Sequence, residues 1–320
     1  MTHVATNGSA EKIIRYEKDP RTRIATITID RPDHLNAPTI EARLRYADLL
    51  HRANVDDDVK VLVIRGVGDD LGTGADLPEY MKVHNSPDPG PRLAEYRIGP
   101  DEVTFPPKGS FRYGATVGQW YANANSGIRG LQDFKKISIL EVKGYCYGWH
   151  FYQAADADLV ISSDDALFGH PSFRYFGWGP RMWWWAQTMG LRKFQEMVFT
   201  GRPFTAKEMY DCNFLNSVVS RSELEAEVDK YAMACSRNRP TDTVFMQKTF
   251  FEVMKQFQGE YMGSMLGGLF ETINGAAQPD RDDLRFDDAI DRGLNTAVKD
   301  NDSKFPPEWR LSKSARLQKD

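Results

Sequence analysis

Two glycine-containing segments have the residue types needed to build a binding site from backbone groups. Their sequences are Gly72-Thr-Gly-Ala-Asp-Leu77 and Gly144-Tyr-Cys-Tyr-Gly-Trp-His150. Each follows an aliphatic, β-branched run and precedes a segment with helical spacing, which is the pattern of a turn between a strand and a helix. Glycine lets the backbone turn sharply, and the first turn of a helix carries unpaired N–H groups. Two such turns that open toward the same side can direct two N–H donors at one oxygen, as in an oxyanion hole.

Side chains with acid–base character follow the second of these segments. His150 stands at the start of the predicted helix, and His170 comes shortly before Ser172. Histidine titrates near neutral pH, so either ring can act as a base or an acid. The alternative is that both are structural histidines hydrogen-bonded to the backbone. Phenols able to hold a carbonyl, or simply to pack, are present at Tyr145, Tyr147, Tyr152 and Tyr175.

The elements around the first turn form a β–α–β unit. Alternating β-branched residues predict a strand at 23–30, paired with a strand at 13–17. Apolar residues at helical spacing predict a helix over 39–53 with Thr39 as its N-cap. The continuous β-branched run at 59–65 indicates a strand buried on both faces. We therefore expect an α/β fold with a parallel sheet flanked by helices.

The rest of the chain divides into an insertion, the remainder of the α/β core, and a helical region. Residues 83–126 are rich in proline and predict an inserted loop near the site, with one or two short helices. Further strands are predicted at 137–143, 158–162 and 166–168. Helices are predicted at 128–134, 148–157, 183–189, 193–200, 206–212, 221–238 and 241–257. The expected organisation is a flexible tail at 1–12, a core at 13–202, a helical region at 203–303 and a C-terminal tail at 304–320.

Composition excludes several functional classes. Forty-one basic residues against 45 acidic ones give a net charge of −4, which argues against nucleic acid as a partner. No run is apolar enough for a membrane span, and the N-terminus has no apolar signal core. Three scattered cysteines indicate neither a disulfide framework nor a metal site. We expect a cytoplasmic protein that binds a small molecule and holds no metal.

An ordered set of short motifs, from about Ile13 to Ala297, resembles the crotonase (enoyl-CoA hydratase/isomerase) superfamily. The matching segments are Arg31-Pro32 with Asn36-Ala37, Gly74-Ala-Asp-Leu77, Val142-Lys-Gly-Tyr145, Ala157-Asp-Leu159, Phe168-Gly169 and Phe199-Thr-Gly-Arg202. The resemblance implies a crotonase-like ββα spiral of repeated βαβ turns, followed by a helical trimerisation region. It also implies self-association as a homotrimer or hexamer.

The same resemblance implies a chemistry and a set of site residues. The family stabilises a thioester enolate with two backbone N–H groups, which here would be those of Ala75 and Trp149. Asn36 and Ala37 would line the site, and Lys82 would lie near the phosphates of coenzyme A. Coenzyme A would then be part of a thioester substrate, with no tightly bound cofactor.

Two departures from the family pattern affect the predicted reaction. Tyr152 and Ser172 occupy the positions at which hydratases carry glutamates that activate water. Their absence argues against simple hydration and directs attention to His150 and His170. An aromatic segment around 173–185 indicates packing in the core or a subunit interface, or alternatively a wall for a bulky acyl group. Arg174 within it is a candidate for binding a carboxylate or phosphate.

Three hypotheses follow. The first is an enzyme on a CoA thioester, of hydratase, lyase or isomerase type, that holds an enolate at Ala75 and Trp149. The second is a C–C bond hydrolase of a β-dicarbonyl compound that uses histidine bases, since a minority branch of the superfamily cleaves cyclic diketones in that way. The third is a catalytically silent scaffold that keeps the fold and the oligomer.

Overall fold

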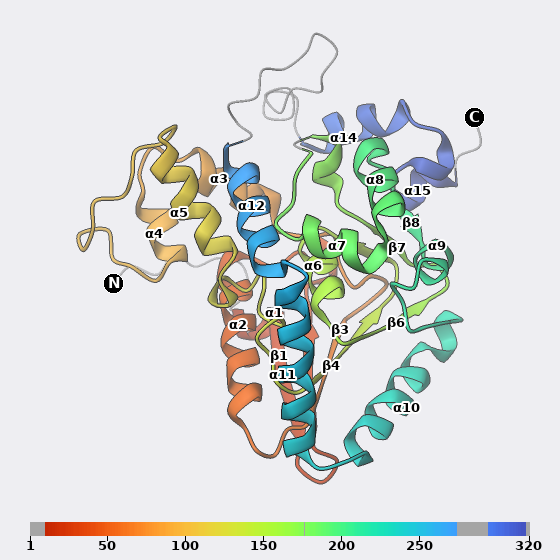
Figure 1. The fold of residues 1–320 in the computed structure, drawn as a ribbon. Coiled ribbons are helices and arrows are strands. Elements are labelled where there is room, and N and C mark those ends of the chain that lie inside the picture. Colours follow the sequence, from red (N-terminus) through yellow and green to blue (C-terminus); the bar gives the residue numbers. More distant parts are fainter. Residues whose placement is uncertain (1–9, 176, 274–293, 318–320) are drawn as a thin grey trace.

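The computed structural model describes residues 10–175, 177–273 and 294–317. A six-stranded sheet in the order β1-β2-β3-β4-β6-β9 forms the centre of this structure (Figure 1). Its strands are β1 (Ile14–Asp19), β2 (Ile24–Ile29), β3 (Val61–Gly66), β4 (Ile137–Val142), β6 (Leu159–Ser163) and β9 (Ser217–Val219). Only β1 and β2 pair antiparallel, and every other pair is parallel. The predicted α/β fold with a parallel sheet is confirmed.

A smaller sheet lies beside the first and has the order β5-β7-β8. Its strands are β5 (Tyr145–Tyr147), β7 (Leu167–Gly169) and β8 (Phe204–Thr205). β5 lies inside the segment that sequence patterning predicts as a glycine turn. Gly72 forms an isolated parallel bridge with Cys146 of β5, so the first turn extends this small sheet by one residue.

Helices cover both faces of the large sheet. Val61, Val63 and Ile139 point toward α10, whereas Leu62 and Leu140 point into the main core. This two-sided burial explains the unbroken aliphatic runs of β3 and β4. The helices of this core are α1 (Ala10–Ile13), α2 (Ile40–Val55), α3 (Leu77–Asn85), α6 (Trp149–Asp156), α7 (Met182–Met189), α8 (Leu191–Thr200), α9 (Ala206–Asp211), α10 (Leu224–Arg237) and α11 (Thr241–Phe257).

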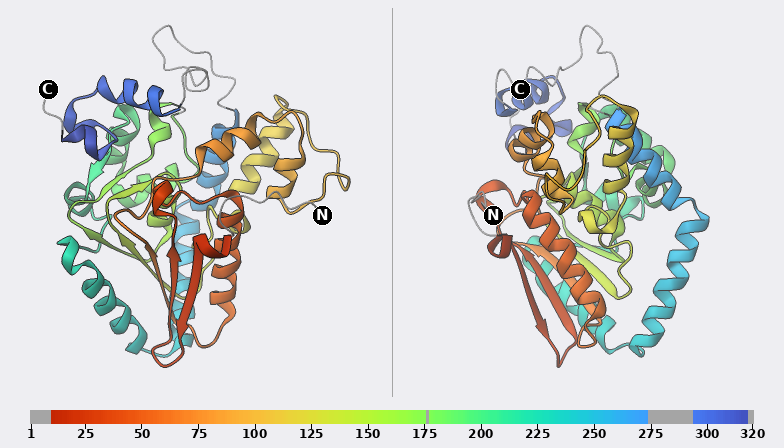
Figure 2. Two further views of the ribbon diagram at one scale, coloured as in Figure 1. Left: turned by 180° about the vertical axis from the view of Figure 1, so that it is seen from behind. Right: turned by 90° about the vertical axis from the view of Figure 1, so that its left-hand side faces the viewer.

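The segments between strands agree with expectation at the insertion and differ from it at 128–134. The insertion at 83–126 contains α4 (Gly90–Glu95) and the longer α5 (Phe111–Tyr121), and both stand out at one side of the molecule (Figure 2). The helix predicted over 128–134 is wrong, since these residues form successive turns. Gly127 there has φ +75°, and a Cβ on it would lie 2.4 Å from the carbonyl oxygen of Arg43. The chain therefore follows α2 closely at this point, in a conformation that a helix does not allow.

The C-terminal part continues beyond the predicted helices. α12 (Glu260–Ile273) follows α11 directly, and α14 (Leu294–Ser303) and α15 (Lys313–Arg316) complete the described chain. Residues 304–317 of the expected C-terminal tail lie against the small sheet, where Tyr147 Oη donates to the carbonyl of Leu311 across 2.9 Å. The expected flexible tail at 1–12 falls mostly outside the described residues, as does part of the helical region at 203–303.

Short 3₁₀ turns join several of these elements. They are η1 (Pro32–His34), η2 (Ala124–Ser126), η3 (Pro171–Arg174), η4 (Arg221–Glu223) and η6 (Pro307–Trp309). Within the described ranges, no helix has both the length and the apolar character to cross a bilayer. The same part of the chain holds no group of three or more metal-ligating side chains.

Candidate functional site

The two glycine turns predicted to carry the site touch each other. Gly72 N–H donates to the carbonyl of Tyr145 across 2.8 Å, and Tyr147 N–H donates to the carbonyl of Gly72 across 3.0 Å. These bonds bring Gly74 against Gly148, so that a Cβ on Gly74 would lie 3.3 Å from the Cα of Gly148. Both residues have positive φ, +106° and +55°. Glycine is therefore required at each position for its conformation and for the close approach.

The amides of Ala75 and Trp149 are left unpaired where these turns meet. Leu71, Gly72, Thr73, Gly74 and Asp76 around the first turn all donate their N–H groups to acceptors. Ala75 N–H and Trp149 N–H find no acceptor among the described residues. A Cβ on Gly74 would lie 3.5 Å from the Trp149 nitrogen. The two turns are therefore close enough for one small group to contact both. Two adjacent free donors of this kind can stabilise an oxyanion.

The Trp149 side chain is directed away from these amides. Its Nε1–H donates to the carbonyl of Gly127 across 2.7 Å. Its ring packs edge-on against Tyr46, with the centroids 5.0 Å apart. The indole is buried in the core. Tryptophan in place of the family's glycine therefore fills a core position and does not occupy the space in front of the amide.

His150 lies behind the paired turns and contacts the first of them. Its Nδ1 accepts a hydrogen bond from the Gly74 N–H across 3.1 Å, and its ring packs onto Gly72, where a Cβ would lie 2.2 Å from Cε1. Burial lowers the pKa of His150 to about 3, opposed by the backbone of Tyr147 and Asn36. A neutral ring whose Nδ1 is already an acceptor is a poor base at neutral pH. The geometry gives His150 a positioning role.

Tyr152, His170 and Ser172 do come together. His170 Nε2 lies 2.7 Å from Ser172 Oγ and 3.3 Å from Tyr152 Oη. Ser172 donates its hydroxyl proton to the carbonyl of Trp178 across 2.7 Å, so we assign the proton of His170 to Nε2. With this tautomer the Tyr152 hydroxyl proton is free for another acceptor. Burial lowers the pKa of His170 to about 4, so this ring is also neutral near pH 7.

Asn36 and Ala37 hold the loop that precedes the first turn. The Asn36 side chain donates to the carbonyls of Val67 and Asp70 across 2.9 and 2.7 Å. Arg31 donates to the carbonyl of Ala37 across 2.8 Å and pairs with the carboxylate of Asp76 at 2.6 Å. These contacts fix the segment before Ala75. The predicted site residues Asn36 and Ala37 therefore hold the backbone of the first turn in position.

Two other predicted binding residues, Arg174 and Tyr145, contact the C-terminal segment, and Tyr175 lies next to Arg174 in the chain. Arg174 forms an ion pair with Asp302 at 2.9 Å and donates to the carbonyls of Gly201 and Trp309. Tyr145 Oη accepts from the amide of Lys313 across 2.6 Å. The Tyr175 hydroxyl is buried without a hydrogen-bond partner among the described residues. The Arg174 guanidinium and the Tyr145 hydroxyl are thus engaged by the C-terminal segment, although the Tyr145 carbonyl belongs to the paired turns.

Lys82 of α3 is open to solvent. It lies in the last turn of the helix that begins two residues after Ala75. Its side chain is exposed, and it forms no ion pair within the described part of the chain. A free cation at this place can meet an anionic portion of a ligand.

Sequence analysis missed one carboxylate near Tyr152. Glu271 lies in the last turn of α12, and its Oε2 is buried without a hydrogen-bond partner among the described residues. Burial raises the pKa of Glu271 to about 8. A negative charge on Glu271 would in turn raise the pKa values of Tyr152 and Tyr80, which places the three groups in one neighbourhood. The spacing that could have indicated this inward face is Glu260, Ser264, Gly267, Gly268 and Glu271.

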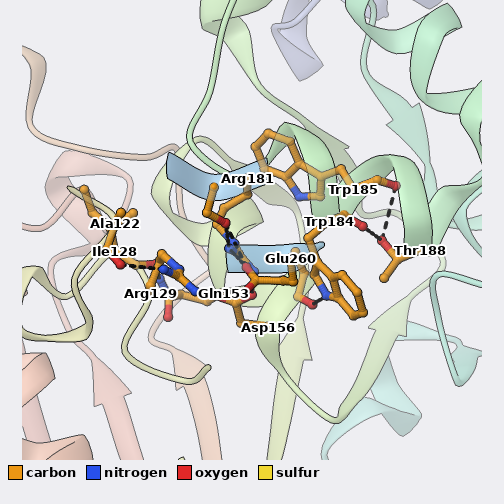
Figure 3. Close-up of polar contacts among 12 residues, drawn as sticks. Ala122, Ile128, Arg129, Gln153, Asp156, Arg181, Trp184, Trp185, Thr188 and Glu260 are labelled. Atoms are coloured by element: carbon orange, nitrogen blue, oxygen red, sulfur yellow. Dashed lines mark hydrogen bonds and ion pairs between the residues drawn. The ribbon is translucent and has the colours of Figure 1, made fainter. Parts of the chain in front are cut away.

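A buried ion network fixes α12 beside α6 and α7 (Figure 3). Arg181 forms short ion pairs with Asp156 of α6 and with Glu260 of α12, and it also donates to Ser264 across 2.6 Å. Arg129 pairs with the other oxygen of Glu260 at 2.9 Å. Asp156 is thus paired with Arg181. The network sets the position of α12 relative to the helix that carries Tyr152.

Comparison with known proteins agrees with this arrangement. The family model described as "Enoyl-CoA hydratase/isomerase" matches residues 115–265. The chain is 24% identical to the mevalonyl-coenzyme A hydratase sidH of Aspergillus fumigatus over 301 residues, which is 92% of this chain and 94% of that protein. It is 26% identical to the hydroxycinnamoyl-CoA hydratase-lyase of Pseudomonas fluorescens over 209 residues, which is 63% of this chain and 65% of that protein.

Solved structures give the same result for the fold. An enoyl-CoA hydratase from Mycobacterium smegmatis superposes with a TM-score of 0.75 at 24% identity, covering 92% of this chain and 94% of that one. A probable enoyl-CoA hydratase from Mycobacterium thermoresistibile has a TM-score of 0.66 at 26% identity, with coverage of 82% and 94%. The architecture is therefore the crotonase-type α/β spiral. In sequence and in fold, the chain is similar to members of the crotonase (enoyl-CoA hydratase/isomerase) superfamily.

Proposed function

We propose that this protein is an enzyme that processes an acyl-CoA thioester through an enolate held by the amides of Ala75 and Trp149. The observation that carries the proposal is the meeting of two glycine turns at which the N–H groups of Ala75 and Trp149 lack acceptors, while the preceding amides of the first turn are paired. Each such donor contributes roughly 3 to 4 kcal/mol in mutational tests on other enzymes. The names of the relatives support a CoA thioester as the substrate class.

The side chains around the amides favour a bulky or aromatic acyl group. Tyr80 of α3 and Tyr152 of α6 both lie near Tyr121 of α5, since a charge on Tyr121 would raise the pKa of each. Phenol rings offer large apolar faces together with one polar group each. An aromatic acyl chain would pack against these faces while its thioester carbonyl meets the amides.

The low basicity of both histidines bears on the choice of reaction. A β-dicarbonyl hydrolase of the kind considered above needs a histidine that takes a proton from water. Burial lowers the pKa values of His150 and His170 to about 3 and about 4, which makes both weak bases at neutral pH. Isomerase or lyase chemistry on a thioester does not require either ring as a base, so we favour it.

Calorimetry with CoA esters tests the proposal directly. The purified protein is titrated with butyryl-CoA, 3-phenylpropionyl-CoA, free CoA and 3-phenylpropionate. We expect both esters to bind, the phenyl ester more tightly, and the free acid not to bind. Failure of both esters to bind, together with binding of the free acid, would overturn the thioester assignment.

We also propose that the protein self-associates, as a trimer or a hexamer. Apolar side chains remain exposed along α11 and the start of α12. Those with the largest exposed fractions are Met246 at 70%, Phe250 at 61%, Phe257 at 89% and Met262 at 69%. Apolar surface of this extent usually marks an interface in a water-soluble protein. Sedimentation velocity on the wild type and on Phe257→Asp tests this, and a wild type that sediments as a monomer at micromolar concentration contradicts it.

A further inference from the structure

We propose that Glu271 is the acid–base group of this site and that it replaces the two glutamates absent at Tyr152 and Ser172. The inference rests on the proposed function, because it assigns the proton donor and acceptor for the enolate held at Ala75 and Trp149.

Glu271 is the last member of the inward-facing stripe of α12. Glu260 and Ser264 begin this stripe and bind Arg181, as described above. Gly267 and Gly268 continue it, and residues three or four positions apart share one face of a helix. Glu271 lies four positions after Gly267 and three positions after Gly268, and therefore on the same face of α12. Its Oε2 is accordingly buried.

Backbone contacts hold this stripe close to the site. A Cβ on Gly268 would lie 2.9 Å from the carbonyl oxygen of Gly118, so α12 packs directly on α5. Thr272 Oγ1 donates to the carbonyl of Gly114 across 2.8 Å. Both views of the fold show α12 beside α5 (Figures 1 and 2). α12 is therefore held against α5 at Gly268 and at Thr272, which precede and follow Glu271 in the chain.

A second set of contacts leads from α12 to Tyr152. A Cβ on Gly267 would lie 3.2 Å from the carbonyl oxygen of Gly179, and a Cβ on Gly179 would lie 2.9 Å from Cδ2 of His170. His170 in turn lies 3.3 Å from Tyr152 Oη. Glu271, one turn beyond Gly267, thus faces the region of the phenol that stands at the family's first glutamate position.

The surroundings of Glu271 are phenols and no cation pairs with it among the described residues. Tyr80 of α3 and Tyr152 of α6 face this region, and the Arg43 and Arg92 guanidinium groups are paired with Glu95. Arg181, which precedes α7, pairs with Glu260 and Asp156. A carboxyl group that is buried without a cation remains protonated at neutral pH. It can therefore give a proton and take it back.

The proposed step is a proton transfer. The carboxyl O–H bond of Glu271 breaks, and its proton goes to the α-carbon of the enolate. The electron pair of the enolate C=C bond forms the new C–H bond, and the thioester C=O bond is restored. The negative charge passes from the thioester oxygen to the Glu271 carboxylate. The reverse step removes an α-proton and regenerates the enolate, with no oxidant or reductant involved.

Exchange of α-protons with solvent deuterium tests this step without knowledge of the natural substrate. 3-Phenylpropionyl-CoA is incubated in D₂O with wild type, Glu271→Gln, Glu271→Asp and the control Glu225→Gln, and deuterium is measured by mass spectrometry. We expect exchange by wild type and by Glu225→Gln, a loss of about 100-fold or more in Glu271→Gln, and partial activity in Glu271→Asp. Glu225 is an exposed carboxylate on α10 that pairs with Arg65 on the surface.

Binding and stability measurements separate the two proposals. The dissociation constant of 3-phenylpropionyl-CoA should change less than about threefold in Glu271→Gln, because the amides remain. Glu271→Gln should also melt at a higher temperature than wild type near pH 8, since glutamine carries no buried charge. Exchange by Glu271→Gln at the wild-type rate would overturn the role of Glu271 and leave the proposed function standing. A wild type that binds the ester without exchange would overturn the enolate and the role of Glu271 together.

Discussion

The amide N–H of Gly74 donates a hydrogen bond to Nδ1 of His150 across 3.1 Å. This bond joins the two glycine turns, because Gly74 belongs to the first and His150 starts the helix after the second. It uses the amide that directly precedes Ala75 and thereby leaves the Ala75 N–H as the free donor of the first turn. A residue that sequence analysis considers as a base is thus placed where it orients the backbone.

We expect His150→Ala to destabilise the protein and to reduce turnover, whereas His150→Asn should retain much of both. Asparagine places its Oδ1 close to the position of Nδ1 and can accept from Gly74. Alanine leaves that buried N–H unsatisfied and opens a cavity, which costs about 2 to 4 kcal/mol in the free energy of unfolding. Urea denaturation and the deuterium exchange assay measure the two effects. Equal loss of exchange in both variants, with stability retained in His150→Asn, would indicate a chemical role for the ring.

Replacing Ala75 by proline should reduce catalysis strongly. Proline has no N–H, so Ala75→Pro removes one donor, and the expected loss in kcat is about 100- to 1,000-fold. Ala75→Ser keeps the N–H and is the matched control, with an expected loss below about tenfold. Circular dichroism verifies that both variants fold. Wild-type kcat in a folded Ala75→Pro variant would contradict the role of this amide.

Two histidines that are buried in their neutral forms should lower thermal stability in mild acid, whereas the raised pKa of Glu271 acts in the opposite direction. The folded-state pKa values of His150 and His170 are lowered to about 3 and about 4 from an ordinary value of 6.5. Below about pH 6.5 the unfolded chain binds these protons and the folded chain does not, so stability decreases as the pH falls. The melting temperature is measured from about pH 7 to about pH 4.5. His170→Gln, which keeps a donor near Nε2, should flatten this dependence, and an unchanged slope would contradict the burial argument.

Gly268→Ala should destabilise the protein although alanine favours helices. On an exposed helical surface this substitution stabilises by up to about 1 kcal/mol. Here the new Cβ would lie 2.9 Å from the Gly118 carbonyl oxygen, and overpacking of this kind costs roughly 1 to 3 kcal/mol. The control Leu266→Ala changes an exposed residue of the same helix. Chemical denaturation measures both, and a more stable Gly268→Ala would show that α12 does not pack this closely on α5.

Removing the charge of Glu260 should be far more costly than removing a surface charge. Glu260 pairs with Arg181 and Arg129 in the buried network, and breaking a buried pair costs about 3 to 5 kcal/mol. The surface pair of Glu225 with Arg65 contributes at most about 1 kcal/mol. The free energies of unfolding of Glu260→Gln and Glu225→Gln provide the comparison. Similar values for the two variants would contradict the structural role of the network.

Local patterns were sufficient for most of the architecture and for the two turns. The predicted helix over 39–53 is observed as Ile40–Val55 with Thr39 as its N-cap, because capping and apolar periodicity are properties of neighbouring residues. The glycines at 74 and 148 are required by positive φ, which is also local. β5 escaped prediction because it is three residues long and is held by pairing with Gly72 and β7.

The sequence by itself determined the order of strands and helices, the family motifs and the positions at which free amides could stand. Only the tertiary structure decided which side chains could act together with those amides. Burial changed the protonation of His150 and His170, and α12 brought Glu271 into the neighbourhood of Tyr152. Burial and proximity between distant segments arise from packing of the whole chain. No local pattern of residues encodes them.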